Sequence, residues 1–147
     1  MEFDLEKKLI FLKYLSDSYN DMKMHYINQQ QKDIWSTEKI LSKLTSDELK
    51  IVNLRKQLPN EIILDVEDRS KLEEIKTKLE LKNWNYEIWD TGSRGIHISL
   101  KFNVLGELSL ELRNRIRKYV INEFGTDENL AKETQWLALE YSKHFKT

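Results

Sequence analysis

The stretch Glu61-Ile62-Ile63-Leu64-Asp65-Val66-Glu67 decides the fold of this 147-residue chain, because it has the clearest β-strand pattern in the sequence. It is rich in residues that favour strands, it follows Pro59-Asn60, and it ends in charged residues. Side chains two positions apart leave the same face of a strand. We therefore expect the carboxylates of Asp65 and Glu67 side by side.

Toward the C-terminus, helix and strand patterns alternate after this first strand. Apolar residues recur every three or four positions in two segments and every second position in the others. The resulting order, β-α-β-β-α-β, predicts an α+β fold in which two helices lie on one side of a four-stranded sheet. Gly125 suits the position just after the end of a helix. The pattern predicts helices over 70–81 and 108–124, and further strands over 84–89, 96–102 and 135–141.

Toward the N-terminus, the sequence reads as helical. An apolar stripe with helical spacing runs from Leu5 to Tyr26. We expect a helical N-terminal region over 1–58, packed as an appendage on an α+β core over 59–147, the whole forming one compact unit. Shorter helices would follow the polar run 28–31, at the candidate N-caps Ser36 and Ser46.

The composition excludes several classes of protein. Hydrophobic residues make up 39% and charged residues 33%, with 24 Lys+Arg against 25 Asp+Glu, which is incompatible with general disorder and with a generally basic nucleic-acid wrapper. The absence of cysteine removes disulfides, zinc-thiolate sites and thiol catalysis. No apolar run reaches the ~20 residues of a membrane span, and the first residues are too acidic for a signal peptide. We expect an intracellular, cytoplasmic protein with no membrane partner.

The first candidate for chemistry is the pair Asp65 and Glu67. Two adjacent carboxylates repel each other, and a divalent cation between them relieves the repulsion. The alternative is a solvated strand end that leads into Asp68-Arg69, and spacing alone favours that alternative.

The second candidate is His97 with the loop Thr91-Gly92-Ser93-Arg94-Gly95 that precedes it. His97 alternates with apolar neighbours, so it lies on the face opposite them. In a β-α-β-β-α-β sheet the first and third strands are neighbours, which brings His97 near Asp65 and Glu67. Arg94 and the free backbone N–H groups of the loop suit phosphate oxygens. The alternative is a plain hairpin turn.

Two further segments carry polar residues after the last helix. Asp127 follows the helix end, where its alternative role is to cap a turn over 129–133. The chain ends in Ser142-Lys143-His144-Phe145-Lys146-Thr147, and a basic tail of this kind is usually a frayed terminus.

Taken together, these segments resemble the archaeo-eukaryotic primases. Leu64-Asp65-Val66-Glu67 resembles the hydrophobic-Asp-x-Asp/Glu motif of that family, and Thr91-Gly92-Ser93-Arg94-Gly95-Ile96-His97 resembles its Ser-Gly-Arg-Arg-Gly-x-His loop and strand. Asp127-Glu128-Asn129-Leu130-Ala131-Lys132 is similar to the segment with its third carboxylate, Asp-x-Asn-Val-Ser/Thr-Lys, and His144-Phe145-Lys146-Thr147 to its late His-x-Lys-Thr. The order and approximate spacing of all four agree.

The resemblance implies an RRM-like catalytic core and a DNA primase or primase-polymerase, a nucleotidyltransferase that joins nucleotides on a DNA or RNA template. It implies that Asp65, Glu67 and Asp127 hold two Mg²⁺ or Mn²⁺ ions. A larger primase or replication subunit is an expected partner. The residues that the resemblance assigns to the nucleoside triphosphate are Thr91, Ser93, Arg94, His97, His144 and Lys146.

Several departures from the family pattern keep alternatives open. Ser93 replaces an arginine of the loop, Trp136 stands where a histidine is common, and Ala138 stands where a basic residue is expected. A non-catalytic, nucleotide-binding accessory subunit of a primase or replication complex is therefore the main alternative. An RRM-like module for single-stranded RNA is a weaker one, because carboxylates on the open face repel a phosphate backbone. Template binding would rely on a local basic patch of Arg113, Arg115, Arg117, Lys118, Lys143 and Lys146.

Overall fold

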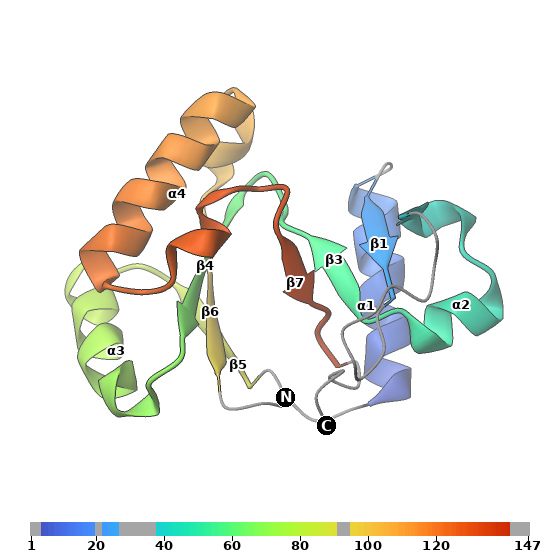
Figure 1. The fold of residues 1–147 in the computed structure, drawn as a ribbon, viewed down its shortest axis with the longest axis horizontal. Helices are drawn as coiled ribbons and strands as arrows, with labels where there is room; N and C mark the ends of the chain where they lie inside the picture. Colours follow the sequence, from blue (N-terminus) through green and yellow to red (C-terminus); the bar gives the residue numbers. More distant parts are fainter. Residues whose placement is uncertain (1–3, 20–21, 27–37, 91–94, 142–147) are drawn as a thin grey trace. The chain divides into compact units, whose positions relative to one another are not determined.

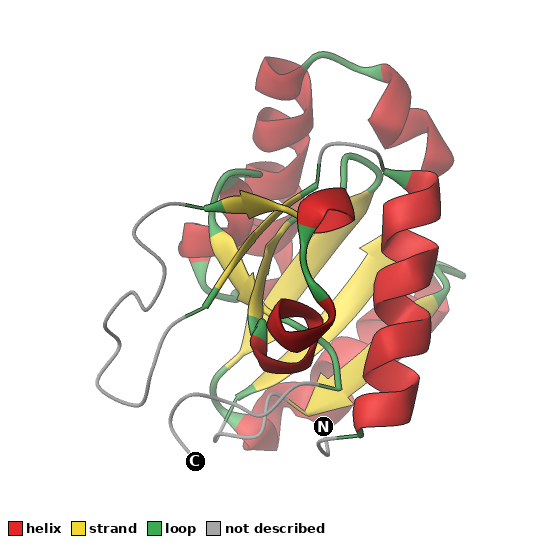
Figure 2. Cartoon of the chain, turned by 90° about the vertical axis from the view of Figure 1, so that its right-hand side faces the viewer, coloured by secondary structure: helices red, strands yellow, loops and turns green. Residues whose placement is uncertain are grey.

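A computed structural model of the chain describes residues 4–19, 22–26, 38–90 and 95–141 (Figure 1). The chain mixes α-helices with two antiparallel sheets, so the predicted α+β class is confirmed (Figure 2). It divides into two compact units. We call residues 57–90 and 94–135 the central unit, and the remaining residues, which include both chain ends, the terminal unit.

The terminal unit contains a four-stranded antiparallel sheet in the order β2-β1-β3-β7. Asp4 caps its first helix, and Thr45 and Glu48 form a capping box at its second. Its elements are α1 (Leu5–Ser18), β1 (Lys23–His25), β2 (Lys39–Ile40), the 3₁₀ turn η1 (Leu41–Lys43), α2 (Ser46–Ile51), β3 (Leu54–Lys56) and β7 (Trp136–Ala138).

A buried ion pair joins distant segments of the terminal unit. The guanidinium of Arg55, on β3, donates from Nε and Nη2 to the two carboxylate oxygens of Glu140, each at 3.0 Å. Arg55 and Glu140 are separated by 85 positions in the sequence, and both side chains are almost fully buried. The pair therefore fixes the C-terminal segment onto the sheet that the first part of the chain forms.

The central unit is a three-stranded antiparallel sheet in the order β4-β6-β5, with α3 and α4 on one side of it (Figure 1). Its elements are β4 (Glu61–Val66), η2 (Arg69–Lys71), α3 (Leu72–Leu81), β5 (Tyr86–Asp90), β6 (Ile96–Lys101), η3 (Asn103–Glu107), α4 (Leu110–Phe124) and η4 (Glu128–Ala131).

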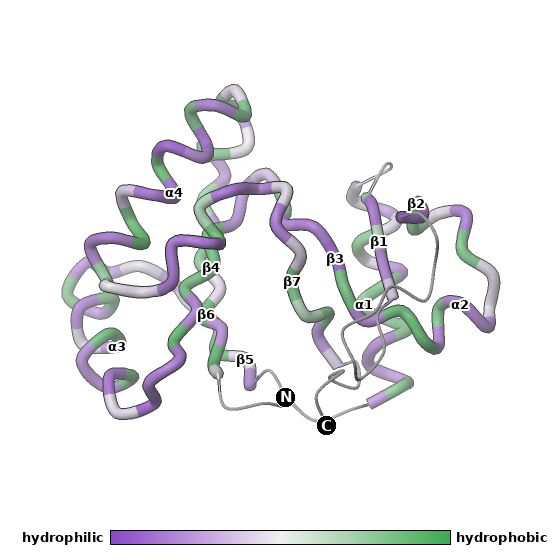
Figure 3. Tube along the Cα trace, viewed as in Figure 1, coloured by the Kyte–Doolittle hydropathy of each residue, from purple (hydrophilic) through white to green (hydrophobic). Residues whose placement is uncertain are grey.

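The core of the central unit lies between the sheet and these two helices. In the register, Leu64 of β4 is opposite Ile98 of β6, and both side chains are fully buried on the face that packs against the helices. Hydrophobic residues follow one another along β4, whereas α4 alternates between hydrophobic and hydrophilic residues (Figure 3). The helices contribute the buried residues Ile75, Leu79, Val120, Ile121 and Phe124.

Arg117 connects α4 to the start of β4. Its side chain is fully buried, and its guanidinium donates to the backbone oxygens of Glu61 and Leu58 at 3.0 and 2.9 Å. Glu133 lies 2.9 Å from Arg117 and accepts two hydrogen bonds of 2.8 Å from Arg113. Burial of an arginine needs this complete set of acceptors, because an unpaired buried charge is costly.

A buried glutamine holds the two ends of the central unit together. Gln57 is the first residue of the unit, and its side-chain amide donates to the backbone oxygens of Leu130 and Lys132 at 2.8 and 3.0 Å. The chain therefore enters and leaves the central unit at neighbouring points.

The helices and strands predicted between residues 60 and 125 are confirmed, and Gly125 adopts the left-handed conformation at the end of α4 with φ of 66°. The predicted helix from Leu5 to Tyr26 is wrong in its second half, where β1 is a strand. Met22 and Met24 are both buried, so this segment also fits the period of two that a strand requires. Residues 1–58 are consequently not purely helical.

The last strand pairs with a partner that the sequence did not predict. β7 is antiparallel to β3 in the terminal unit, so the four-stranded sheet predicted for the core has three strands here. The turn η4 packs against β4, which is an edge strand of the sheet. Of the predicted caps, Ser36 lies outside the described residues, and Ser46 is the first residue of α2, whose N-cap is Thr45. The short helix expected after Ser36 is wrong, because the strand β2 and the turn η1 occupy its place.

Candidate metal and nucleotide site

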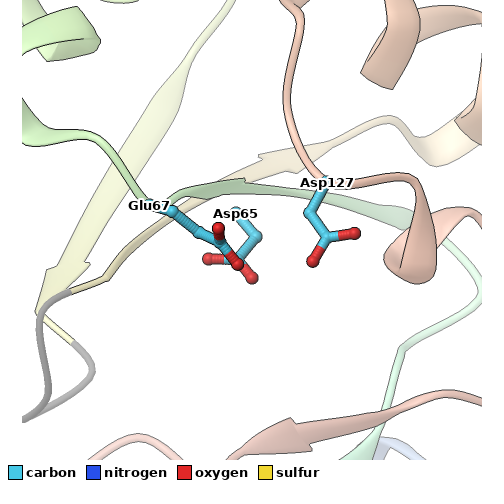
Figure 4. Close-up of side chains that lie close together, drawn as sticks. All are labelled: Asp65, Glu67 and Asp127. Carbon is cyan, nitrogen blue, oxygen red and sulfur yellow. The ribbon is translucent and has the colours of Figure 1, made fainter.

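Three carboxylates converge in the central unit. Asp65, Glu67 and Asp127 each offer an oxygen atom, and these atoms all lie within 4.8 Å of one another (Figure 4). Asp65 and Glu67 come from β4 and the residue after its end, whereas Asp127 comes from the segment after α4. The structure therefore brings together the three acidic residues that the sequence singled out.

Gly125 is responsible for the position of Asp127. Its left-handed backbone ends α4 and turns the chain toward β4. Asp127 then caps η4, because one of its oxygens accepts a 2.9 Å hydrogen bond from the backbone N–H of Asn129. The capping role that was the alternative for Asp127 is thus confirmed, and it coexists with a place in the carboxylate cluster.

His97 lies next to this cluster. It is directly opposite Asp65 in the antiparallel pairing of β4 and β6, and its Nε2 is 3.7 Å from Oδ1 of Asp65. The predicted proximity of His97 to Asp65 is therefore confirmed. A protonated or donating Nε2 at this position faces an acidic site, where a phosphate group coordinated to a cation would also carry negative charge.

The negative charges of the three carboxylates oppose one another. The pKa of Asp65 is raised to about 6, first by burial of its side chain and then by the charges of Asp127 and Glu67. A cation bound among the three carboxylates would reverse the second effect, because each negative charge would then face a positive one.

A cavity of about 200 Å³ opens at the cluster. Lys71 and the backbone around Gly125 contribute to its walls, beside the three carboxylates. Carboxylate oxygens are the ligands that Mg²⁺ and Mn²⁺ prefer, and two oxygens on opposite sides of such an ion are ~4 Å apart. The donor set, its spacing and its charge therefore fit a hard divalent cation.

The other predicted ligands of the nucleotide are not described by the structure. Thr91, Ser93 and Arg94 lie outside the described residues, as do His144 and Lys146. Their assignment stays a prediction.

The expected basic patch for the template is wrong in two of its members. Arg117 is fully buried, and Arg113 is held by Glu133, so neither offers its charge to a phosphate backbone. The reason is helical geometry, because position 117 falls on the buried stripe of α4 with Val120 and Phe124. Arg115 and Lys118 line an open groove of about 550 Å³, together with Lys132.

One residue near the site was missed by the sequence analysis. Trp89 of β5 is directly opposite His97 of β6, in the same row as Asp65. The sequence signal was an interruption of the alternation, since Ile88 and Trp89 are adjacent apolar residues in a strand that otherwise alternates.

Comparisons with known proteins found no relative of this chain from which a function could be carried over. No family model, curated protein or solved structure matches the chain. Among the described residues, no helix combines the length and the apolar character that crossing a bilayer requires.

Proposed function

We propose that the central unit is a metal-dependent nucleotidyltransferase centre of the primase or primase-polymerase type, which joins nucleotides on a DNA or RNA template inside the cell. The observation that supports this proposal most is the convergence of Asp65, Glu67 and Asp127 from two distant segments, with His97 beside them. These are the residues that the resemblance to archaeo-eukaryotic primases assigns to metal and nucleotide.

The strand order of the central unit supports an RRM-like core as part of the proposal. In β4-β6-β5 the first and third strands of the unit are neighbours, and the second strand is at the far edge. This is the arrangement expected for a β-α-β-β-α-β unit without its fourth strand. It accounts for the direct pairing of Asp65 with His97, on which the site depends.

In the proposed mechanism, Asp65, Glu67 and Asp127 hold Mg²⁺ or Mn²⁺ with their carboxylate oxygens. When bound, the ions would supply charge stabilisation for an in-line displacement at the α-phosphate. His97 donates a hydrogen bond from Nε2 to a phosphate oxygen on the side of Asp65. Asn129 holds Asp127 through its backbone N–H, which keeps that carboxylate turned toward β4.

The triphosphate is assigned to Arg94, Thr91 and Ser93 of the loop before β6, and to His144 and Lys146. A larger primase or replication subunit would supply template affinity, because the chain has a net charge of −1 and two of its expected basic residues are occupied by Glu133.

The proposal is tested by metal binding and by primer synthesis. Calorimetry with Mn²⁺ is expected to detect binding to the wild type and none to Asp65→Ala/Glu67→Ala. The matched control is Glu107→Gln, which removes an exposed carboxylate of η3 outside the cluster. Primer synthesis with Mn²⁺ and all nucleoside triphosphates is expected in the wild type and in Glu107→Gln, and not in Asp65→Ala/Glu67→Ala.

Failure of Mn²⁺ to bind the wild type would overturn the metal site and the function with it. Binding of metal and nucleotide without product, on any template and with a partner subunit added, would instead establish the accessory role. That result would agree with the loss of basic residues at Ser93 and Ala138.

A further inference from the structure

Asp65, His97 and Trp89 form one row across the three strands of the central sheet. The pairing of β4 with β6 places Asp65 opposite His97, and the pairing of β5 with β6 places Trp89 opposite the same His97. Residues directly opposite in antiparallel strands share a face, and neighbouring strands are ~4.8 Å apart. Trp89 therefore lies two strand spacings, ~10 Å, from Asp65 on the face that carries the carboxylate cluster.

The two tryptophans near β5 have different surroundings. Trp84 packs edge-on against Phe102, with ring centroids 5.1 Å apart, and also contacts Phe124 in the core. Trp89 is half-buried and belongs to the opposite face of the sheet from Ile88 of β5 and from the buried Leu64 and Ile98 of the neighbouring strands. An indole on the polar face of a sheet presents a flat, apolar surface beside a charged site.

The charges around Trp89 determine what kind of group it would contact. Glu87 is two positions before it on β5, so it lies on the same face and is exposed. Because Glu87 carries a negative charge on the N-terminal side of Trp89 in β5, that side of the indole disfavours a phosphate group. It favours an uncharged aromatic group, for which the indole is a stacking partner.

We propose that Trp89 is the platform on which the base of a nucleotide stacks when the phosphates of that nucleotide are held at the carboxylate cluster. This inference rests on the proposed function and adds the recognition of the base to it. The row then has three parts in order, carboxylate for the metal, His97 for phosphate and Trp89 for the base. Stacking tolerates any of the four bases, because each has an aromatic face.

The test compares a ligand that has a base with one that lacks it. Calorimetry in the presence of Mn²⁺ measures the affinity of ATP and of inorganic tripolyphosphate for the wild type, Trp89→Leu and Trp89→Phe. Trp89→Leu is expected to weaken ATP binding about 5- to 150-fold, the range that alanine substitution gives for a stacked base, and to leave tripolyphosphate affinity unchanged. Trp89→Phe keeps an aromatic ring, so it is expected to retain most of the affinity for ATP.

The matched control is Trp84→Phe, which alters the other tryptophan of this region without touching the row. In Trp84→Phe, ATP is expected to quench tryptophan fluorescence as in the wild type, and in Trp89→Phe the quenching is expected to disappear. The fluorescence arm uses variants that keep an aromatic ring, so it does not depend on the fold of Trp89→Leu.

The outcomes separate this inference from the function on which it rests. If the wild type binds both ligands, and Trp89→Leu changes both affinities equally or neither, the platform is overturned and the metal site stands. Quenching that persists in Trp89→Phe overturns it as well. If the wild type binds neither ligand with Mn²⁺, the proposed function fails, and the platform fails with it.

Discussion

At the scale of single residues, the surroundings of Asp65 disfavour the ionised form of its carboxyl group. Its side chain is only 22% exposed, and burial together with Asp127 and Glu67 raises its pKa to about 6. A folded-state pKa above the ordinary value of 3.8 means that the native protein keeps a proton that the unfolded chain has lost. Between about pH 4 and pH 6, stability therefore falls as pH rises.

We predict that Asp65→Asn stabilises the metal-free protein at neutral pH. The upper limit is about 3 kcal/mol, from a shift of roughly two pKa units at 1.36 kcal/mol each, and partial exposure reduces it to about 1–2 kcal/mol. The measurement is urea unfolding with a chelator present at pH 4 and pH 7. The advantage of Asp65→Asn is expected to be small at pH 4 and to grow as pH rises.

Glu107→Gln is the control for this prediction, since it removes one exposed carboxylate outside the cluster. Equal effects of the two substitutions at pH 7 would show that net charge, rather than the cluster, is responsible. Added Mn²⁺ is expected to reverse the ranking, because the wild type gains binding free energy that Asp65→Asn loses.

At the scale of elements, the end of α4 decides whether the third carboxylate reaches the site. Gly125 has φ of 66°, where a residue with a Cβ is strained by roughly 1–2 kcal/mol. A Cβ on Gly125 would meet nothing within 4 Å, so the cost would come from the backbone and not from a clash.

We predict that Gly125→Ala destabilises the protein by about 1–2 kcal/mol and weakens Mn²⁺ binding, because relief of the strain moves the turn that carries Asp127. Gly106→Ala is the matched control. Its Cβ would meet the Asn60 side chain at an ordinary 3.6 Å, and it is expected to change stability by less than about 1 kcal/mol. Thermal unfolding and calorimetry measure both effects. If Gly125→Ala leaves Mn²⁺ affinity unaltered, the turn at Gly125 is not needed to position Asp127 for metal binding.

Local patterns predicted the elements of the central unit because each carries a clear signal. In α3 and α4 the apolar residues have helical spacing, whereas β4 is a short run of strand-favouring apolar residues bounded by Pro59-Asn60 and by charge. Met22 and Met24 fit a strand, whereas Met22 and Tyr26 fit a helix, so β1 was ambiguous. Pairing with β2 and β3 selects the strand. Tertiary contacts therefore decide between the two structures that the local pattern of β1 allows. The pattern of residues 22–26 alone does not contain that information.

At the scale of the whole molecule, the buried pair of Arg55 and Glu140 carries much of the connection between the first and last parts of the chain. Removing one member of a buried ion pair leaves the other charge without a partner, which costs about 3–5 kcal/mol. Replacing both members with apolar residues removes that cost.

We therefore predict that Glu140→Leu destabilises the terminal unit by about 3–5 kcal/mol, and that Arg55→Met/Glu140→Leu recovers most of the loss. Urea unfolding followed by far-UV circular dichroism measures the three proteins. Lys13→Leu is a control, because its pair with Asp17 is 3.7 Å long and exposed, and it is expected to change stability by less than about 1 kcal/mol. A double variant as unstable as the single one would contradict the prediction.

The sequence predicted the proximity of the carboxylates and His97 because its signals are local to the central unit. Asp65 and Glu67 share a strand, His97 lies on the neighbouring strand, and Asp127 follows a glycine that ends a helix. The partner of β7 was not predictable in the same way, since three residues pair equally well with any free edge until the rest of the fold selects one. Trp89 was missed because its position opposite His97 depends on the register of the strand pairs.

The amide of Gln57 also has a consequence for the order in which the protein forms. During synthesis every residue of the central unit leaves the ribosome before β7 does, so its sheet and helices are free to form while β3 still lacks its last neighbour. Closing an open chain of 85 residues costs about 4 kcal/mol in entropy. Once the central unit has folded, the hydrogen bonds of Gln57 to Leu130 and Lys132 hold its two ends close together. The chain that must be closed to pair β3 with β7 is then much shorter, and the entropy cost is smaller. The folded central unit thus brings β7 close to β3 along the chain, and the terminal unit is completed last.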